Sequence, residues 1–213
     1  MARRVRIDQD SSEERLEKLI AERLQLGADT ARIDARVWDL FGETWAIMFT
    51  DLAGFSRRVS DFGIIHFLQI IQESQRLLIP CIDRYDGFLL KTDGDSLLVI
   101  YRNLRKAVEC ALEMHRVVKE YDAGRDPAEK IRLCIGLGWG RVLRIGDRDV
   151  FGAEVNAAAK LGEDVAGTGE IIVSEAARRA VETLDPPLDG TAFNSLDSLP
   201  AGVEGAHRLV FNL

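Results

Sequence analysis

The sequence predicts an α+β domain with a ferredoxin-like βαββαβ core, in which an antiparallel-rich sheet carries helices on one face. Two observations lead to this prediction. From residue 45 onward, short apolar runs typical of buried strands alternate with amphipathic helical stretches. An Asp-Gly turn also joins two of the strands directly into a hairpin. A chain of 213 residues, 46% of them hydrophobic, is long enough for one such domain and an appendage.

Two amphipathic helices are expected ahead of this core, in an N-terminal helical extension at residues 1–43, with the main domain at 44–213. Ser11 or Ser12 can cap the first helix, and Gly27 ends it. The helical stripes consist of Leu16, Leu19, Ile20 and Leu24, and then of Ile33, Val37 and Leu40. Two roles are open for these helices: packing against the main domain, or acting as a dimerising or signal-transmitting element.

The first half of the main domain contains the patterns of a strand, a helix and a hairpin. WAIMFT, which begins at residue 45, is a short apolar run typical of a buried strand, and residues 61–84 carry a long helical pattern. Two apolar strands within 88–101 flank Asp93-Gly94, and this dipeptide is a strong signal for a tight hairpin turn.

The second half repeats the alternation of helix and strand. A helix is expected at 103–121, followed by a strand-like stretch at 130–145 that Gly136, Gly138 and Gly140 interrupt. Another helix is expected from near Gly152 to about Ala166. A strand in GEIIVS, a short helix in EAARRAVETL and a last apolar strand in the tail, 188–213, complete the prediction.

The composition limits the classes of partner. A net charge of -7 and a pI of about 5.1 disfavour broad binding to nucleic acid or to an anionic membrane. The three cysteines are scattered and odd in number, so we expect buried free thiols in a reducing compartment rather than a metal site. We find no apolar run near 18 residues and no secretory signal, and we therefore expect a cytoplasmic chain, which could still be cut from a larger receptor.

The stretch FTDLAGFS, residues 49–56, places an acid where the first strand stops. After Asp51 the chain turns into a helix through Ala53, Gly54 and Phe55, whose backbone N–H groups can face a phosphate. A carboxylate beside such amides suits a metal-bound phosphate. The simpler alternative is that Asp51 only caps the helix.

Asp95 favours the metal interpretation. It follows the turn of the hairpin, and in a ferredoxin-like sheet the first strand neighbours this hairpin, so Asp51 and Asp95 are expected to converge. Two carboxylates at one place repel each other unless a cation bridges them, and two-metal phosphoryl chemistry needs that arrangement. Asp93 is a competing candidate, although a turn residue at that position needs no further explanation.

Three blocks together resemble a known family. FTDLAGFS, KTDGDSLLV and DVFGAEVNAAAKL, in this order, are similar to the signature blocks of the class III nucleotidyl cyclases, whose catalytic domain has a palm-type fold. The resemblance covers about residues 44–183. We find no GGDEF-like hairpin, which disfavours the related palm-type diguanylate cyclases.

The resemblance implies an adenylate cyclase that converts ATP to 3′,5′-cyclic AMP and pyrophosphate. Asp51, Asp95 and the Leu52 carbonyl match the ligands of two Mg²⁺ or Mn²⁺ ions. Lys91 and Asp149 match the pair that selects the base, with the lysine donating to adenine N1 and the carboxylate accepting from the N6 amino group. Taken alone, Lys91 is more often a solvated hairpin lysine and Asp149 a turn residue.

The last block departs from the family at one position. Asn156 matches an asparagine that orients the ribose. Lys160 stands where an arginine usually stabilises the transition state. The positive charge is kept, but the planar guanidinium with its five N–H donors is replaced by an ammonium group. The family's site lies between two chains, which implies a homodimer with shared active sites and allows regulation by an upstream element. The alternative is a catalytically weak or inactive nucleotide-sensing module, which the lysine favours.

Overall fold

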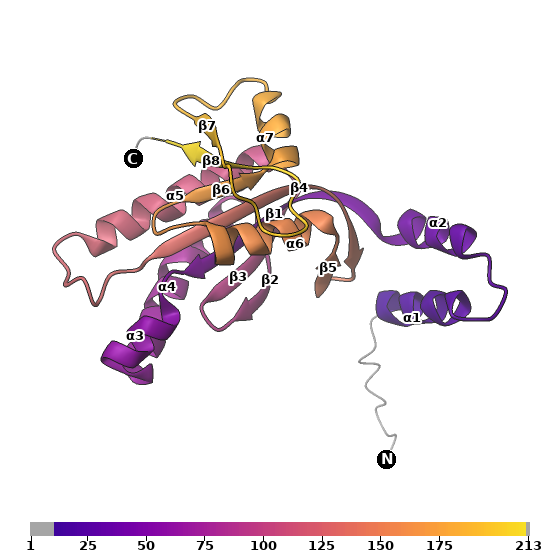
Figure 1. Cartoon of the computed structure of the whole chain (residues 1–213), viewed down its shortest axis with the longest axis horizontal. Coiled ribbons are helices and arrows are strands. Elements are labelled where there is room, and N and C mark those ends of the chain that lie inside the picture. Colours follow the sequence, from indigo (N-terminus) through magenta and orange to yellow (C-terminus); the bar gives the residue numbers. More distant parts are fainter. Residues whose placement is uncertain (1–10, 212–213) are drawn as a thin grey trace, which may run out of the picture.

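The structure is a computed structural model, and it describes residues 11–211. One eight-stranded sheet has the order β2-β3-β1-β4-β6-β8-β7, with β5 pairing β4 (Figure 1). The strands are β1 (Gly42–Leu52), β2 (Phe88–Asp93), β3 (Ser96–Tyr101), β4 (Leu133–Ile145), β5 (Asp149–Phe151), β6 (Ile171–Ser174), β7 (Ala192–Ser195) and β8 (Ala206–Val210). The helices are α1 (Ser11–Arg23), α2 (Thr30–Phe41), α3 (Phe55–Phe62), α4 (Ile64–Arg84), α5 (Leu104–Asp122), α6 (Ala153–Lys160), η1 (Leu161–Val165) and α7 (Glu175–Glu182). The predicted α+β class and βαββαβ order are confirmed.

Two elements differ in detail from the prediction. The stretch 130–145 forms a continuous strand from residue 133, because its glycines are compatible with extended backbone and β1 pairs along it without a register break. The helix predicted at 61–84 is confirmed as α4, which starts at Ile64, and a separate helix, α3, precedes it. Gly63, with a positive φ of +85° that glycine adopts readily, ends α3, and α4 starts at the next residue.

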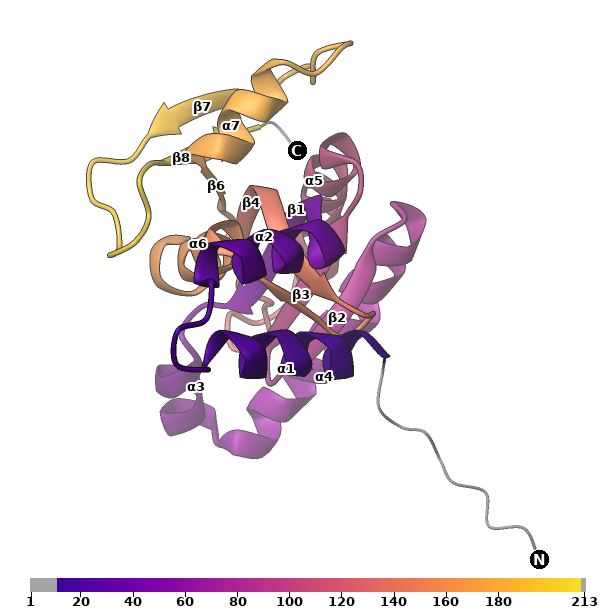
Figure 2. The same ribbon diagram turned by 90° about the vertical axis from the view of Figure 1, so that its right-hand side faces the viewer.

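The main core lies on one face of the sheet, between the strands and helices α4, α5 and α7. Met48 and Val99 from the strands and Met114 from α5 are fully buried there. Helix α6 covers the opposite face (Figure 2). There Trp45, Ile47 and other apolar residues pack against Ala158. The sequence placed all helices on one face; the correction is that α6 lies on the other.

The extension forms a helical pair that packs on the domain. Leu19 of α1 and Val37 and Phe41 of α2 bury their side chains together with Ile145 at the end of β4. Packing against the main domain is therefore observed, while a dimerising or signalling role stays a prediction. The strand β1 begins at Gly42, so it includes the last two residues of the predicted extension.

Two expectations from composition can be compared with the structure. Cys81, Cys110 and Cys134 are all buried and unpaired, as expected for free thiols. Among residues 11–211, no helix combines the length and apolarity that a membrane crossing requires.

Candidate active site

Asp51 and Asp95 lie close enough to influence each other. Asp51 ends β1 and its Oδ1 accepts a hydrogen bond from Ser96 Oγ at 3.2 Å. Burial raises the pKa of Asp51, and burial followed by repulsion from Asp51 raises the pKa of Asp95. Each shift means that the site disfavours the ionised carboxylate, and a cation there would relieve this cost. The two acids that the sequence placed at strand ends are thus brought together by the pairing of β1 with β3.

The turn after Asp51 offers fewer free amides than expected. The Ala53 N–H donates to the Arg132 carbonyl at 2.9 Å, so this amide is engaged just beyond the end of the β1–β4 ladder. Gly54 has a left-handed backbone with φ +84°, and α3 starts at Phe55. Of the three predicted phosphate-binding amides, Gly54 and Phe55 are the ones at the start of the helix, where the positive end of the helix dipole favours an anion.

Lys91 and Asp149 form an ion pair. The Lys91 Nζ donates to Asp149 Oδ2 at 2.8 Å, although the residues are 58 positions apart in the chain. Asp149 Oδ1 accepts from the Val150 N–H at 2.9 Å, which orients the carboxylate. The register of β2 shifts between Leu89 and Lys91, and such an irregularity re-aims side chains. Sequence reasoning expected these two residues at one purine edge, and the structure brings them together.

Helix α6 lies directly on the backbone of β4. A Cβ atom added at Gly136 would come within 2.0 Å of the Ala158 carbonyl oxygen, and one at Gly138 within 2.6 Å of the Glu154 carbonyl oxygen. Only glycine permits this approach. These glycines were expected to interrupt the strand. Instead they form the surface against which α6, the helix that carries Asn156, packs.

Asn156 and Lys160 have different surroundings. Asn156 is exposed on α6. The Lys160 Nζ donates to the Ala201 carbonyl in the loop between β7 and β8, at 2.5 Å. Leu199 and Val203 of this loop pack against an apolar cluster built around Leu161. The lysine ammonium is thus bound by its own chain.

A cavity of about 380 Å³ lies between the hairpin β2–β3 and helix α6. Lys91, Asp93, Ser96 and Glu163 line it, together with Phe49, Leu98 and Ala159. Burial, and then repulsion from Asp51 and other acids, raises the pKa of Glu163. Sequence reasoning missed Ser96 and Glu163. The signal for Glu163 was its place three residues after Lys160, close to the same helical face.

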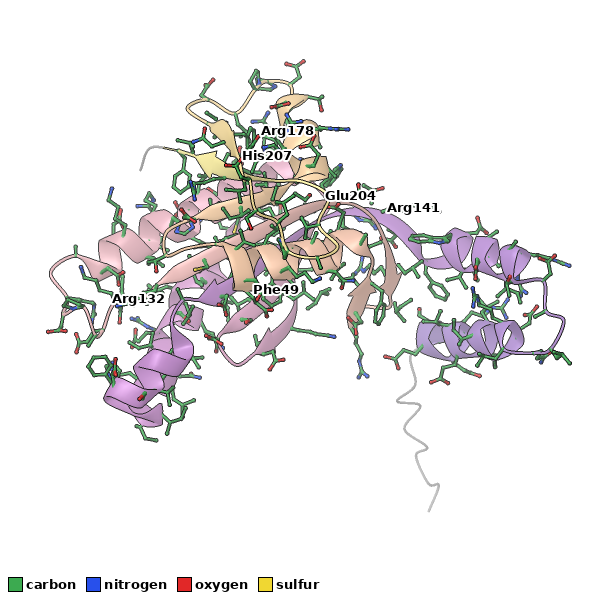
Figure 3. The ribbon with its side chains drawn as sticks, in the orientation of Figure 1. Phe49, Arg132, Arg141, Arg178, Glu204 and His207 are labelled. Atoms are coloured by element: carbon green, nitrogen blue, oxygen red, sulfur yellow. The ribbon has the colours of Figure 1, made fainter. Side chains whose placement is uncertain are left out.

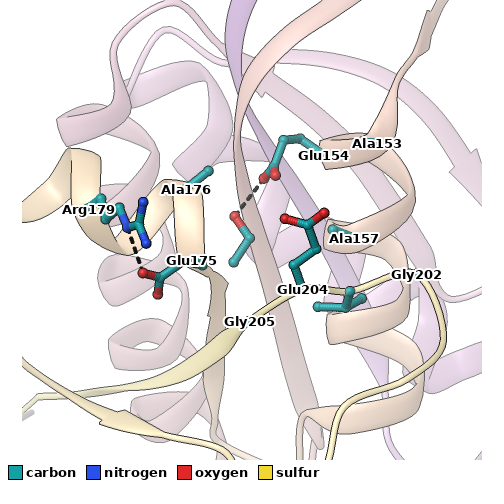
Figure 4. A pocket seen from close by; sticks show the side chains of 11 residues that line it. Ala153, Glu154, Ala157, Glu175, Ala176, Arg179, Gly202, Glu204 and Gly205 are labelled. Carbon is teal, nitrogen blue, oxygen red and sulfur yellow. Dashed lines mark hydrogen bonds and ion pairs between the residues drawn. The ribbon is translucent and has the colours of Figure 1, made fainter.

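A second cavity of about 310 Å³ lies between the start of α6, the start of α7 and the segment 202–205 (Figure 4). Glu154 and Glu204 both point into it. Glu154 Oε2 accepts hydrogen bonds from the Trp139 N–H at 3.0 Å and from Ser174 Oγ at 2.6 Å. This carboxylate links α6 to β4 and β6, so we interpret it as a structural anchor of α6.

Three arginines lie near the end of β4 and in the β4–β5 turn: Arg141, Arg144 and Arg148. Arg141 donates to the Trp38 carbonyl at 2.9 Å and points toward α2 (Figure 3). Arg144 donates to the Gly146 carbonyl at 3.1 Å, and Arg148 lies 3.9 Å from a Glu13 oxygen. Arg141 and Arg144 are therefore held by backbone carbonyls of the chain, whereas Arg148 makes only a long ion pair at the surface.

Comparisons with known proteins agree on one family. The model of the adenylate and guanylate cyclase catalytic domain matches residues 42–204. A serine/threonine-protein kinase, pkn2, of Myxococcus xanthus is 28% identical over 66% of this chain and 17% of its own length. A putative adenylate cyclase 3 of Rhizobium meliloti is 29% identical over 61% of this chain and 22% of its own length. The chain thus spans about a fifth of the length of these curated relatives.

Solved structures support the same fold. An adenylate/guanylate cyclase/hydrolase from Silicibacter pomeroyi is 26% identical, covers 79% of this chain and 95% of its own, and superposes with a TM-score of 0.64. A receptor-type guanylate cyclase of Caenorhabditis elegans also matches in sequence, with 22% identity over 76% of this chain. The comparisons therefore do not separate the two purine bases.

Proposed function

Because the chain belongs to the adenylate and guanylate cyclase catalytic domain family, we propose that it is an adenylate cyclase that converts ATP to 3′,5′-cyclic AMP and pyrophosphate. The observation that carries the choice of base is the contact of Lys91 with Asp149 at 2.8 Å. An ammonium donor beside a carboxylate acceptor complements adenine, which presents N1 as an acceptor and the N6 amino group as a donor. Guanine presents the opposite pattern along the same edge, a carbonyl O6 and an N1–H.

The donor set at the end of β1 suits divalent ions. Asp51, Asp95 and the Leu52 carbonyl supply hard oxygen ligands, and burial with repulsion raises the pKa of both carboxyl groups. Within residues 11–211 no group of three or more His, Cys, Asp or Glu side chains has the geometry to hold a metal. Mg²⁺ is usually bound through one or two carboxylates together with substrate phosphates, so the pair Asp51 and Asp95 suits this kind of ion. When bound, two such ions would activate the ribose 3′-hydroxyl and neutralise the triphosphate.

The other residues of the site bind and orient the nucleotide. The start of α3, from Gly54 to Phe55, offers backbone N–H groups to phosphate oxygens. Asn156, exposed on α6, is available to hold the ribose. Lys160 supplies positive charge for the phosphates once its hydrogen bond to the Ala201 carbonyl is replaced by a bond to a phosphate oxygen. Each site uses the metal ligands of one subunit. The base-selecting residues Lys91 and Asp149, together with Asn156 and Lys160, come from the other subunit. The active form is therefore a homodimer with two equivalent sites.

Formation of cyclic AMP from Mn-ATP by the purified chain tests the proposal. We expect a product that Asp51→Ala abolishes, because this variant loses a metal ligand. A wild-type yield no greater than that of Asp51→Ala, while ATP still binds, would refute the enzyme and favour a nucleotide-sensing module. The engagement of Lys160 by Ala201 is the observation that keeps this second function in view.

Mixing two inactive variants tests the shared site. In a dimer of one Asp51→Ala chain and one Asn156→Ala chain, one of the two sites keeps all of its residues. We therefore expect mixing to restore part of the activity that each variant lacks alone. A mixture as inactive as its components, with dimers present by light scattering, contradicts the shared arrangement.

A further inference from the structure

Arg144 joins the strands that carry the base-reading pair, and we propose that it sets the spacing of Lys91 and Asp149 and thereby the preference for one purine base. The inference rests on the proposed function of that pair. Arg144 lies on β4 just before the turn to β5, and its side chain is only 15% exposed. It touches no nucleotide in this proposal, so it is a positioning residue.

On one side, Arg144 holds the turn that leads to Asp149. Its Nε donates to the Gly146 carbonyl at 3.1 Å, and an Nη donates to Asp147 at 2.6 Å. Since the Asp147 side chain is 94% exposed, that ion pair contributes little, and the carbonyl bond is the stronger restraint. Arg144 also pairs in register with Val150, the residue after Asp149. The Arg144 guanidinium therefore restrains the turn into Asp149, in addition to the backbone ladder that pairs β4 with β5.

On the other side, the same guanidinium reaches β1 and β2. Its centre lies 4.8 Å from the ring centroid of Trp45 and 5.4 Å from that of Phe88. The rings of Trp45 and Phe88 meet edge to face at 5.7 Å. Phe88 is on β2, three residues before Lys91. The Arg144 side chain thus contacts β2, which carries Lys91, and the turn that leads to Asp149.

The charge and shape of Arg144 both matter for this link. Glu43 Oε2 lies 4.0 Å from an Arg144 nitrogen and accepts closer hydrogen bonds from Trp45 Nε1 and from Arg102, so it adds negative charge near the mostly buried Arg144 cation. A planar guanidinium can stack on two rings and donate to a carbonyl at once, whereas a lysine ammonium cannot. Because hydrogen bonds weaken outside a narrow range of distances, moving β5 against β2 would misplace the donor or the acceptor for the base.

Equilibrium binding of 3′-deoxy-ATP and 3′-deoxy-GTP tests the inference without turnover, because neither nucleotide has the hydroxyl that cyclises. The variants are Arg144→Lys and Phe88→Leu. The matched control is Arg141→Lys on the same strand, whose guanidinium stacks on Trp38 at 4.8 Å. We expect Arg144→Lys to reduce the ratio of the two affinities about tenfold, and Phe88→Leu to reduce it less. The control should stay within about twofold of wild type.

A folded Arg144→Lys with the wild-type affinity ratio would overturn the inference. If circular dichroism shows that this variant does not fold, Phe88→Leu decides alone, and an unchanged ratio then overturns it. If the wild type binds the adenine nucleotide selectively but forms no cyclic nucleotide, the proposed catalytic activity is refuted. The affinity ratios of Arg144→Lys and Phe88→Leu then still decide this inference. A wild type without base preference refutes the role of Lys91 and Asp149, and this inference with it.

Discussion

Replacing Gly136 by alanine tests whether the close packing of α6 against the backbone of β4 positions the site residues on α6. An alanine Cβ there would lie 2.0 Å from the Ala158 carbonyl oxygen and 2.5 Å from the Gly162 nitrogen. Both are backbone atoms, so relief requires the segment of α6 and η1 to move off the sheet by roughly 1 Å or more. Overpacking of this kind costs about 3 kcal/mol of the free energy of unfolding. The shift would also displace Asn156 and Lys160, and cyclic nucleotide formation should fall with stability.

Gly140 provides the matched control on the same strand and face. A Cβ there would lie 2.9 Å from Glu154 Cγ, a side-chain atom that can shift slightly while the carboxylate keeps its bonds to Trp139 and Ser174, whereas the atoms met at Gly136 are backbone. We expect Gly140→Ala to cost about 1 kcal/mol or less, and Gly138→Ala, which meets the Glu154 carbonyl oxygen at 2.6 Å, to fall between the two. Urea unfolding followed by circular dichroism measures the series. If Gly136→Ala and Gly140→Ala have the same free energy of unfolding, the close packing of α6 on Gly136 is refuted.

Three further predictions concern the base, the transition state and pH. Changing Lys91 to Glu and Asp149 to Cys should move the kcat/KM preference from ATP toward GTP; an unchanged preference contradicts the base assignment. Lys160→Arg should raise kcat by up to about 100-fold, because a planar fork is restored, and a lower kcat would show a site built around lysine. Burial lowers the pKa of His115 to about 4, so the unfolded chain takes up the proton first and stability falls from about pH 6.5 to pH 4, by about 3 kcal/mol. His115→Gln should remove that part of the pH dependence in denaturant titrations, and an identical pH profile would refute it.

The sequence by itself was sufficient to predict the order of the elements and the two metal-binding candidates. Strand and helix periods are local properties, and an Asp-Gly turn specifies a hairpin within four residues. Once β1 was expected beside that hairpin, Asp51 and Asp95 had to approach each other. The resemblance of three motif blocks added the pair Lys91 and Asp149 and the residues Asn156 and Lys160.

Only the tertiary structure decided how these residues are held. The close approach of α6 to Gly136, the stacking of Arg144 on Trp45 and the bond from Lys160 to Ala201 join segments that are distant in sequence. No local sequence pattern specifies such contacts, because they depend on how the strands, α6 and the loop before β8 pack together. Propensity and periodicity act over a few residues, whereas the position of a functional side chain depends on the packing of the whole sheet.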